Sequence, residues 1–523
     1  MVDAIVIGGG HNGLVCANYL AMAGKKVTVL ERRSIVGGAA VTEEFHPGFR
    51  NSIASYTVSL LNPKIIEDLD LHRYGLNIVH RRVNNFWPHD NGDFLAFEVD
   101  AQDLKKEIAR FSKHDAEALQ RYFRDTGLVA DLIRDFLLET PPNVGGGLRE
   151  IFKTAKFANR LRKLSLEDER LVLDIFTKSV ADFLDLYFEN EYVKGAFAFD
   201  GIVGNYADTD TPGSAYVLMH HAFGEVNGKK GVWGHAMGGM GAITQAMAQS
   251  AQAKGVEIRF DAAVSKVLVN GGQAYGVRLE NGEEIKAKVV ASNLNPSFLY
   301  NHLLAAKDLP EDFARRMKHY KNGSGTFRMN VALSELPQFS CLTQQQRATD
   351  DHLTGGIVIG ATPAYIDQAY LDAKQYGWSK APIVEMLIPS TLDDTLAPQG
   401  QHVASLFCQQ FDPDIDWDKH RETAADLIIE QVDKYAPGFK HSVLGRQVLS
   451  PLDLERKFGL SKGDIMHGKM SIDQMFSLRP LMGHGDYRSP IAGLYMCGAG
   501  THPGGGVTGA PGHNAAREIL RDC

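Results

Sequence analysis

The chain has 523 residues, of which 44% are hydrophobic and 23% are charged. This is an ordinary globular composition, and a chain of this length can bury a large core without disulfides or metal ions. The formal net charge of -8 repels phosphate backbones, so nucleic acid is not expected as a partner.

Cysteine usage and hydropathy indicate in which cellular compartment the protein is expected. The five cysteines are scattered and form no C-x-x-C pair, which indicates a reducing environment and argues against a dithiol redox centre or a zinc site. No run of eighteen apolar residues occurs, so no membrane span is expected. The first predicted strand begins at Asp3 and leaves no room for a signal peptide. We therefore expect a cytoplasmic protein that at most contacts a membrane surface.

The first residues have the pattern of a dinucleotide-binding βαβ unit. An apolar run at 4–7 ends in the glycine-rich turn 8–13, and a helical pattern follows over 14–21. A second strand at 27–30 ends at Glu31. Strand, glycine turn, helix and strand in about thirty residues are what this fold requires.

Each glycine of Gly8-x-Gly10-x-x-Gly13 has a predicted role. Gly8 permits a tight turn, Gly10 lets the backbone approach a pyrophosphate, and Gly13 lets helix and strand pack closely. The helix N-terminus offers free N–H groups and a positive dipole end to the phosphates. Glu31, at the tip of the second strand, is placed to accept hydrogen bonds from the ribose hydroxyls of an adenosine.

Two further glycine segments favour FAD over NAD. Gly37-Gly38-Ala39-Ala40 follows Glu31 closely, and a second glycine turn there suits a ligand that extends beyond the pyrophosphate. Near the C-terminus a short apolar strand enters the glycine-rich run 498–506, and a helical pattern begins at 514. Backbone N–H groups of this strand-to-helix connection are suited to ribityl or flavin oxygens. The alternative is a glycine-rich surface loop, which this composition disfavours.

The middle of the chain predicts both helices and strands. Residues 101–140 and 147–200 have mostly helical patterns. From 257 the hydrophobic period changes to two, and tight-turn signals at 271–272 and 281–282 predict a three-stranded meander. Further strands are predicted at 326–333, 356–360, 383–388 and 403–407, and a helix at 422–435.

Three segments carry a resemblance to a known family: the opening G-G-G-H-N-G-L-V-C-A-x-Y-L, then E-R-R-x-x-x-G-G-A-A, and the closing G-A-G-T-H-P-G-G-G-V-T-G-A-P-G-x-N-A-A. They resemble phytoene dehydrogenase-related flavoproteins, a group that includes carotenoid desaturases, ketolases and isomerases. The tract 458–480, with F-G-L, D-I-M-H-G and S-I-D-Q-M-F-S-L-R-P, is similar to one branch, pyridine nucleotide-disulfide oxidoreductase domain-containing protein 2. The resemblance is dense at both ends of the chain and looser in the middle.

The resemblance implies an α/β fold of the glutathione-reductase/amine-oxidase type with noncovalent FAD. A Rossmann-like FAD domain is then interleaved with a mixed-sheet substrate domain and a helical cap. We expect the FAD domain at 1–80, 232–300 and 440–523, the substrate domain at 81–115 and 301–439, and the cap at 116–231. The FAD contacts implied by position are Gly8, Gly10, Gly13, Glu31, Arg32, Gly38, Ala39, Val264, Gly500 and Val507.

Catalytic residues are harder to predict. His502 sits inside the predicted flavin-end loop and is the candidate acid–base residue, although the residue type is equally consistent with a hydrogen bond that holds the loop. His11, in the phosphate turn, is interpreted as structural. The weaker candidates, which flank predicted cofactor segments, are His46, Tyr56, His235 and Arg479. No metal site is expected, because the adjacent pair His220-His221 points to opposite sides of any regular element.

A basic segment at 148–164 combines six lysines and arginines with apolar residues. One interpretation is a helix on an anionic membrane, from which an apolar substrate enters. The other is a solvated basic face packed on the protein, which we favour.

The predicted function is hydride transfer from an apolar, carotenoid- or lipid-like substrate to FAD. A redox-neutral isomerase or a ketolase of the same family is an alternative, and a flavin-free binding protein on the same fold is another. The glycine turn at 238–242 lacks a clear preceding strand, and 355–360 lacks a following helix with the right glycines, so no second nucleotide fold is predicted. Oxygen, a quinone or another diffusible molecule is therefore expected as electron acceptor.

Overall fold

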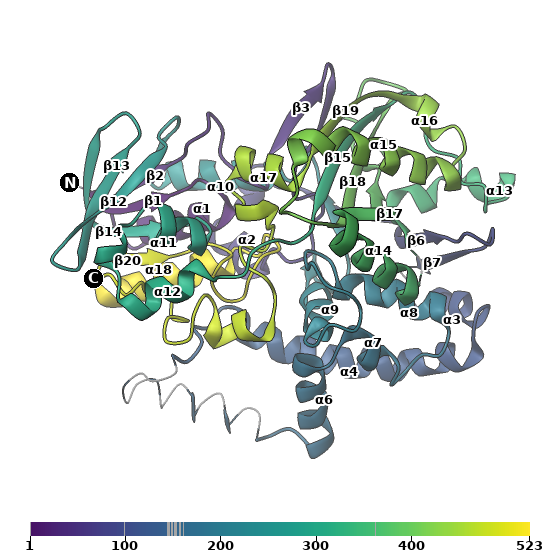
Figure 1. Cartoon of the computed structure of the whole chain (residues 1–523), viewed down its shortest axis with the longest axis horizontal. Coiled ribbons are helices and arrows are strands. Elements are labelled where there is room, and N and C mark those ends of the chain that lie inside the picture. Colours follow the sequence, from purple (N-terminus) through teal and green to yellow (C-terminus); the bar gives the residue numbers. More distant parts are fainter. Residues whose placement is uncertain are drawn as a thin grey trace.

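The computed structural model describes residues 2–98, 100–143, 147, 150, 154–155, 158–159, 162–360 and 362–523 (Figure 1). In these residues the chain builds two seven-stranded sheets side by side, with a group of helices below the second sheet in the view of Figure 1. Most of the basic segment 148–164 lies outside the described residues, so its membrane contact stays a prediction.

The first sheet has the order β11-β2-β1-β14-β13-β12, and β20 pairs with β14. Strands β11, β2, β1, β14 and β20 run parallel, whereas β12, β13 and β14 form the predicted antiparallel meander. The strands are β1 (Val2–Ile7), β2 (Val27–Leu30), β11 (Glu257–Arg259), β12 (Val264–Asn270), β13 (Gln273–Leu279), β14 (Glu284–Ser292) and β20 (Leu494–Met496).

Helices cover both faces of this sheet, which explains why β1 is an apolar run. Ala4 and Val6 belong to a core shared with α1 (His11–Met22), α10 (Gly241–Ala253) and α18 (Ala510–Asp522). Ile5 and Ile7 face the opposite core, which includes α11 (Pro296–His302) and α12 (Glu311–Lys318). A strand buried on both faces needs apolar side chains at every position.

The second sheet has the order β19-β15-β18-β17-β16-β6-β7 and is antiparallel except for the β16–β6 pair. One face packs on α15 (Trp417–Tyr435), while α14 (Pro363–Tyr376) packs from the other side. The strands are β6 (Val83–Pro88), β7 (Phe94–Glu98), β15 (Phe327–Leu333), β16 (Gly356–Ile359), β17 (Trp378–Leu387), β18 (His402–Phe411) and β19 (Val443–Leu449).

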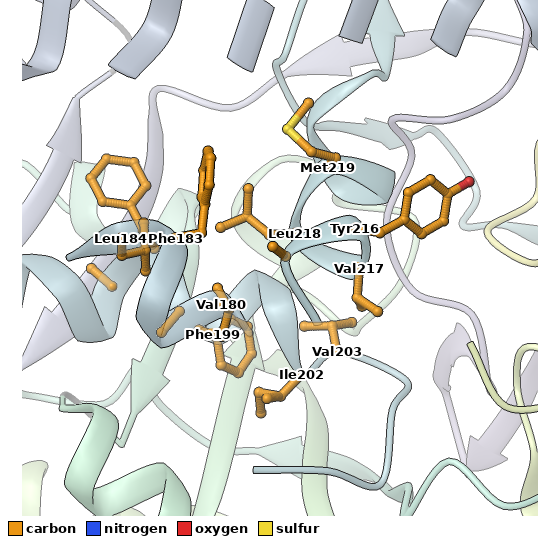
Figure 2. Packing of buried hydrophobic residues seen from close by; sticks show 14 of the residues in the cluster. Val180, Phe183, Leu184, Phe199, Ile202, Val203, Tyr216, Val217, Leu218 and Met219 are labelled. Carbon is orange, nitrogen blue, oxygen red and sulfur yellow. The ribbon is translucent and has the colours of Figure 1, made fainter. Parts of the chain in front are cut away.

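A third group of elements is helical and shares one large apolar core with the face of the second sheet that lies opposite α15. Figure 2 shows its packing, in which Val180, Phe183 and Phe199 meet Val217 and Leu218. The helices are α3 (Ala101–Ala109), α4 (Lys113–Leu137), α6 (Leu166–Thr177), α7 (Val180–Leu184), α8 (Glu191–Ala198) and α9 (Ser214–Ala222).

Short elements connect these parts. They are the helices α2 (Pro63–Asp68), α13 (Gln344–Arg347), α16 (Phe439–Ser442) and α17 (Pro451–Phe458), and the strands β3 (Thr42–His46), β4 (Phe49–Ser52), β5 (Ile78–His80), β8 (Glu225–Val226), β9 (Lys229–Lys230) and β10 (Gly234–Ala236). Among the residues that the structure describes, no helix combines the length and apolar character needed to cross a membrane.

The structure corrects the predicted domain limits at two places. Strand β19 pairs with β15, so 443–449 belongs to the second sheet and not to the FAD-binding part. Phe313 and Met317 of α12 pack under the first sheet, so the limit at 300 is too early. Helix α14 was not predicted, and α15 begins five residues before the predicted 422. The remaining limits stay a prediction.

Candidate active site and cofactor cavity

A large cavity lies at the edge of the first sheet where β1 and β2 end. It measures about 1790 Å³, including the part open to solvent. Its wall combines backbone groups of the glycine turns with apolar and polar side chains, as is usual for a cofactor or ligand pocket. The lining begins at the glycine turn after β1 and ends among Tyr56, Trp233 and Phe407. Ligands of open parallel sheets bind at this edge.

The glycine turn leaves the start of α1 open to a ligand. Gly8 has φ +94°, a left-handed conformation that favours glycine. Gly10 is the N-cap of α1 in extended conformation; no side chain caps the helix and its first turn carries no acid. Uncapped N–H groups at a helix N-terminus attract an anion.

Glu31 is held in place at the end of β2. It is buried, and its two oxygens accept hydrogen bonds from the backbone N–H groups of Gly9 at 2.8 Å and Arg33 at 2.9 Å. Each carboxylate oxygen has a further lone pair, so the group can still accept from ribose hydroxyls. Arg32 lines the cavity, but its guanidinium donates to the carbonyls of Arg456 and Lys457 at the end of α17.

Two other glycine-rich segments close over the turn, as the sequence predicts. Gly37, with φ +125°, donates to the carbonyl of Gly9 at 2.9 Å. In the C-terminal loop, Val507 lines the cavity with φ +60°, a strained conformation for a β-branched residue. Strain of this kind at a cavity wall is typical of functional sites.

Five residues that line the cavity carry a buried polar atom with no hydrogen-bond partner in the described structure: His11 Nε2, Asn12 Oδ1, Arg33 Nη1, Ser55 Oγ and His467 Nδ1. Burial lowers the pKa of His11 to about 3 and that of His467 to about 4, so both rings are neutral at pH 7. A buried polar atom without a partner costs about 1–3 kcal/mol. A polar ligand such as FAD fits this wall because it can supply the missing partners.

The predicted cofactor residues divide into two groups. Gly13 and Gly500 are absent from the cavity wall: a Cβ at Gly13 would lie 2.2 Å from the Gly8 carbonyl, and one at Gly500 would lie 2.3 Å from Pro296 Cδ. Both positions require glycine for packing, which for Gly13 is the role the motif predicts. Those that line the cavity are Gly8, Gly10, Glu31, Arg32, Gly38, Ala39, Val264 and Val507.

His502 is not a cavity residue, which corrects the prediction of an acid–base role. Its buried ring packs edge-on against Phe476, and Nε2 donates to the Phe136 carbonyl at 3.0 Å. Burial lowers the pKa of His502 to about 4. Proximity in sequence to the flavin-end loop was misleading, because the side chain turns away to join that loop to the end of α4.

Sequence reasoning missed several lining residues. Asn12 and His467 carry unpartnered atoms, and Trp233, Phe407 and Met466 form apolar wall, yet these five residues come from four separate segments. His11 was interpreted as structural but lines the cavity. Its place at the first position of α1 was the only available signal. Tyr56, a weaker candidate, does line the cavity.

The one set of potential metal ligands found among the described residues lies elsewhere. Side-chain atoms of His114, Asp115 and Glu189 come within 4.8 Å of one another. The Asp115 oxygens already accept from the backbone N–H groups of Glu189 and Asn190 at 3.0 Å, so they serve the start of α8. The cluster carries no further sign of a metal.

Residues 13–327 match the family described as flavin containing amine oxidoreductase. The chain belongs to this family. It is therefore a flavin-dependent oxidoreductase, and FAD is its cofactor. This removes the flavin-free binding protein as an alternative.

Similar proteins agree with this membership. Pyridine nucleotide-disulfide oxidoreductase domain-containing protein 2 of Rattus norvegicus is 40% identical over 99% of this chain and 93% of its own length. A limonene dehydrogenase subunit of Castellaniella defragrans is 25% identical, covering 99% and 94%. Prolycopene isomerase 2 of an Oncidium hybrid cultivar is 26% identical, covering 97% and 81%.

The fold is also that of solved amine-oxidase structures. Putrescine oxidase bound to putrescine superposes with a TM-score of 0.62 at 14% identity, covering 100% of this chain and 98% of that one. This confirms the predicted combination of a Rossmann-like FAD-binding part and a mixed-sheet part.

We expect Gly10→Val to give folded but colourless protein, because the valine side chain would occupy the space that a pyrophosphate needs. A Cβ there would lie 2.7 Å from the amide end of Asn293, a side chain that can move, so folding should survive. Flavin absorbance and thermal unfolding are the measurements. Gly127→Val on α4, where a Cβ meets nothing within 4 Å, is the control and should stay yellow. Stoichiometric FAD in Gly10→Val would contradict this placement.

We expect His502→Gln to flatten the acid side of the stability profile. The folded ring has a pKa of about 4, below the ordinary 6.5, so the unfolded state takes up the proton first. The contribution of this ring to the free energy of unfolding is fully present above pH 6.5. It falls as pH drops from 6.5 toward 4, by up to ~1.4 kcal/mol per pH unit. Urea unfolding at pH 7, 6 and 5 measures the slope. Equal slopes for wild type and variant would show that His502 is not buried neutral.

Proposed function

We propose that the enzyme is a dehydrogenase or desaturase that removes two hydrogens from an apolar, carotenoid- or lipid-like molecule. The observation that carries this proposal is the change of chemistry along one continuous cavity. One part of the wall consists of glycine turns and buried polar groups, and another is formed by Val203, Trp233 and Phe407. Leu60 and Met466 add apolar surface beside the C-terminal glycines Gly506 and Gly505. An apolar wall next to a cofactor site favours an apolar substrate.

The residues that would hold FAD follow from the wall. We propose that the turn at Gly8 and Gly10 receives the pyrophosphate and that Glu31 accepts from the ribose hydroxyls. Gly38, Ala39, Val264 and Val507 would make backbone or van der Waals contacts along the rest of the cofactor. His11 and His467, both neutral, would supply hydrogen bonds without adding charge.

The chemistry that bound FAD supplies is two-electron oxidation: the substrate loses a hydride to the ring and a proton to a base or water, and a second molecule then takes the electrons. The protein's part is to hold a C–H bond in place and to exclude water. Apolar walls do both without a catalytic dyad. The similar limonene dehydrogenase chain, named for the oxidation of a hydrocarbon, supports this reaction class.

A redox-neutral isomerase or a ketolase is the second candidate. Similarity to a prolycopene isomerase favours the former, since that protein is named for rearranging a polyene. The two reactions would use the same cavity and differ in whether electrons leave the protein.

The test is an incubation of the yellow enzyme with a cell lipid extract in air, followed by mass profiling. A dehydrogenase should yield products lighter by two hydrogens, and Gly10→Val should not. An unchanged mass with altered retention would favour the isomerase, and no change in any lipid would contradict an apolar substrate.

The electron acceptor should not be a nicotinamide bound in its own dinucleotide fold. The start of α10, the best second glycine turn, is already satisfied by protein groups: Thr42 Oγ accepts from the N–H of Gly241 at 2.9 Å, and Ser52 Oγ from Met240 at 2.9 Å. The preceding strand β10 pairs antiparallel with β5 and forms one further antiparallel bridge with Val58, so among the described residues it does not belong to a parallel sheet of a dinucleotide fold. We propose oxygen, a quinone or another diffusible acceptor.

Anaerobic mixing with excess NADPH, then NADH, should leave the visible flavin absorbance unchanged over minutes. Dithionite, which needs no binding site, should bleach it and serves as the control. Rapid, saturable bleaching by either nicotinamide would make the protein a nicotinamide-coupled reductase.

A further inference from the structure

A row of buried polar and aromatic side chains crosses the second sheet on the face that lies opposite α15. Arg328 of β15 is directly opposite Phe407 of β18, and Phe407 is opposite Glu385 of β17. All three side chains are buried, with 0%, 1% and 6% of their surface exposed. Charged residues are rare at such positions because desolvation is costly, so a pair of them in one row requires a partner or a ligand.

Tyr56 connects this row to the main cavity. Its ring stacks on Phe407 with 5.1 Å between centroids, and the Arg328 guanidinium lies 4.6 Å from the ring centre. Its hydroxyl donates to the Glu385 carboxylate. Tyr56 and Phe407 both line the cavity, so the row forms the floor of its apolar end.

A small side chamber opens beside this floor. It shares Tyr56, Thr57, Val203, His221 and Trp233 with the main cavity. Its other walls are Arg81, Asn85, Phe199, Asp200 and Glu385. The chamber therefore adjoins this part of the main cavity across five shared wall residues, yet it is lined by a cation and two carboxyl groups.

The charged groups of the chamber are held apart from one another. Arg81 is buried and donates to the Thr57 hydroxyl, and no carboxylate within the described ranges comes within 4.0 Å of its guanidinium. Glu385 has one oxygen engaged by Tyr56, and its pKa is raised by burial. Burial also raises the pKa of Asp200 to about 7. Charged groups of both signs that are not joined by an ion pair favour a ligand that donates and accepts at once.

The surrounding groups discriminate among possible ligands. A hydrocarbon cannot form a hydrogen bond with Arg81 or Glu385. An ammonium group would be repelled by Arg81, and a carboxylate would be repelled by Glu385 and Asp200. The remaining polar walls, Asn85 and the His221 ring, are neutral: burial lowers the pKa of His221 to about 4, and its Nδ1 donates to the Val217 carbonyl. Charges of both signs in one site act against ions of either sign.

We propose that this chamber binds a hydroxyl group of the substrate, which accepts a hydrogen bond from Arg81 and donates one to Glu385. The inference rests on the proposed function and refines it: the substrate is an elongated apolar alcohol. The hydroxyl anchors the molecule, and the apolar chain extends along Phe407 and Trp233 toward the cofactor. No bond forms or breaks in the chamber.

Binding of four ten-carbon probes to the yellow enzyme tests this, with the flavin difference spectrum as readout. Decan-1-ol should bind at least tenfold more tightly than decane, decanoate or decylamine, since hydrogen bonds to charged groups are worth about 1.5–3 kcal/mol each. Equal or tighter binding of any of the other three, or no binding of all four, would overturn the proposal.

Charge-removing variants separate a binding role from a structural one. Glu385→Gln keeps the size of the side chain and removes one negative charge. The affinity for decanoate relative to that for decan-1-ol should therefore rise about tenfold. Arg81→Met should raise the affinity for decylamine relative to decan-1-ol by a similar factor. Glu283→Gln, on the exposed turn between β13 and β14, is the matched control and should change neither ratio. Unchanged ratios in both chamber variants, with full FAD content, would overturn the proposal.

The hydroxyl-binding proposal and the proposed function can fail independently of each other. If decan-1-ol binds as expected but no lipid in the extract loses two hydrogens, the oxidation is wrong and the hydroxyl site stands. If lipids lose two hydrogens while the probes show no preference for the alcohol, the reverse holds.

Discussion

The close packing of α1 on the end of β1 is the constraint on which the rest of the cavity depends. A Cβ at Gly13 would lie 2.2 Å from the Gly8 carbonyl, and one at Gly512 of α18 would lie 2.1 Å from the carbonyl of Asn12. These two contacts hold α1 between the sheet and the C-terminal helix. Because α18 follows the glycine-rich loop directly, the same contacts bring that loop over the N-terminus of α1. The two ends of the chain thus meet at one edge of the sheet.

The two ends of the cavity are built by different means. In the part proposed to hold the cofactor, glycine turns bring backbone groups to the wall, and polar side chains such as Asn12 and His467 join them. At the other end the wall consists of side chains from the second sheet, the helices and the segment 54–60. A change of side chain at Phe407 or Trp233 would alter the proposed substrate space and leave the glycine turns untouched. Substrate preference can therefore change in such a fold without loss of the cofactor.

The sequence predicted the parts of the site that depend on local geometry. The glycine turn, Glu31 and the second turn at Gly37 are each fixed by contacts within about thirty residues, so their spacing carries the information. His467, Trp233 and Arg81 come from segments that only tertiary packing brings together, and no spacing relates them. His502 failed for the same reason: its partner is the carbonyl of Phe136, hundreds of positions away in the chain.

The second sheet shows a further limit of pattern reading. In β15, Arg328 stands between Phe327 and Met329, and such alternation is typical of an antiparallel strand with one solvent-facing side. Here both faces are covered, and Arg328 is fully buried. Burial lowers its pKa to about 10, so it still carries its charge at neutral pH. The positive charge of a buried arginine must be stabilised by nearby groups. Glu385 in the same row stabilises it through its negative charge, and the Tyr56 ring through its π face. The charged row and the Tyr56 ring that lines the cavity therefore stabilise each other. Removing either charge alone would leave the other buried and unbalanced next to the substrate space.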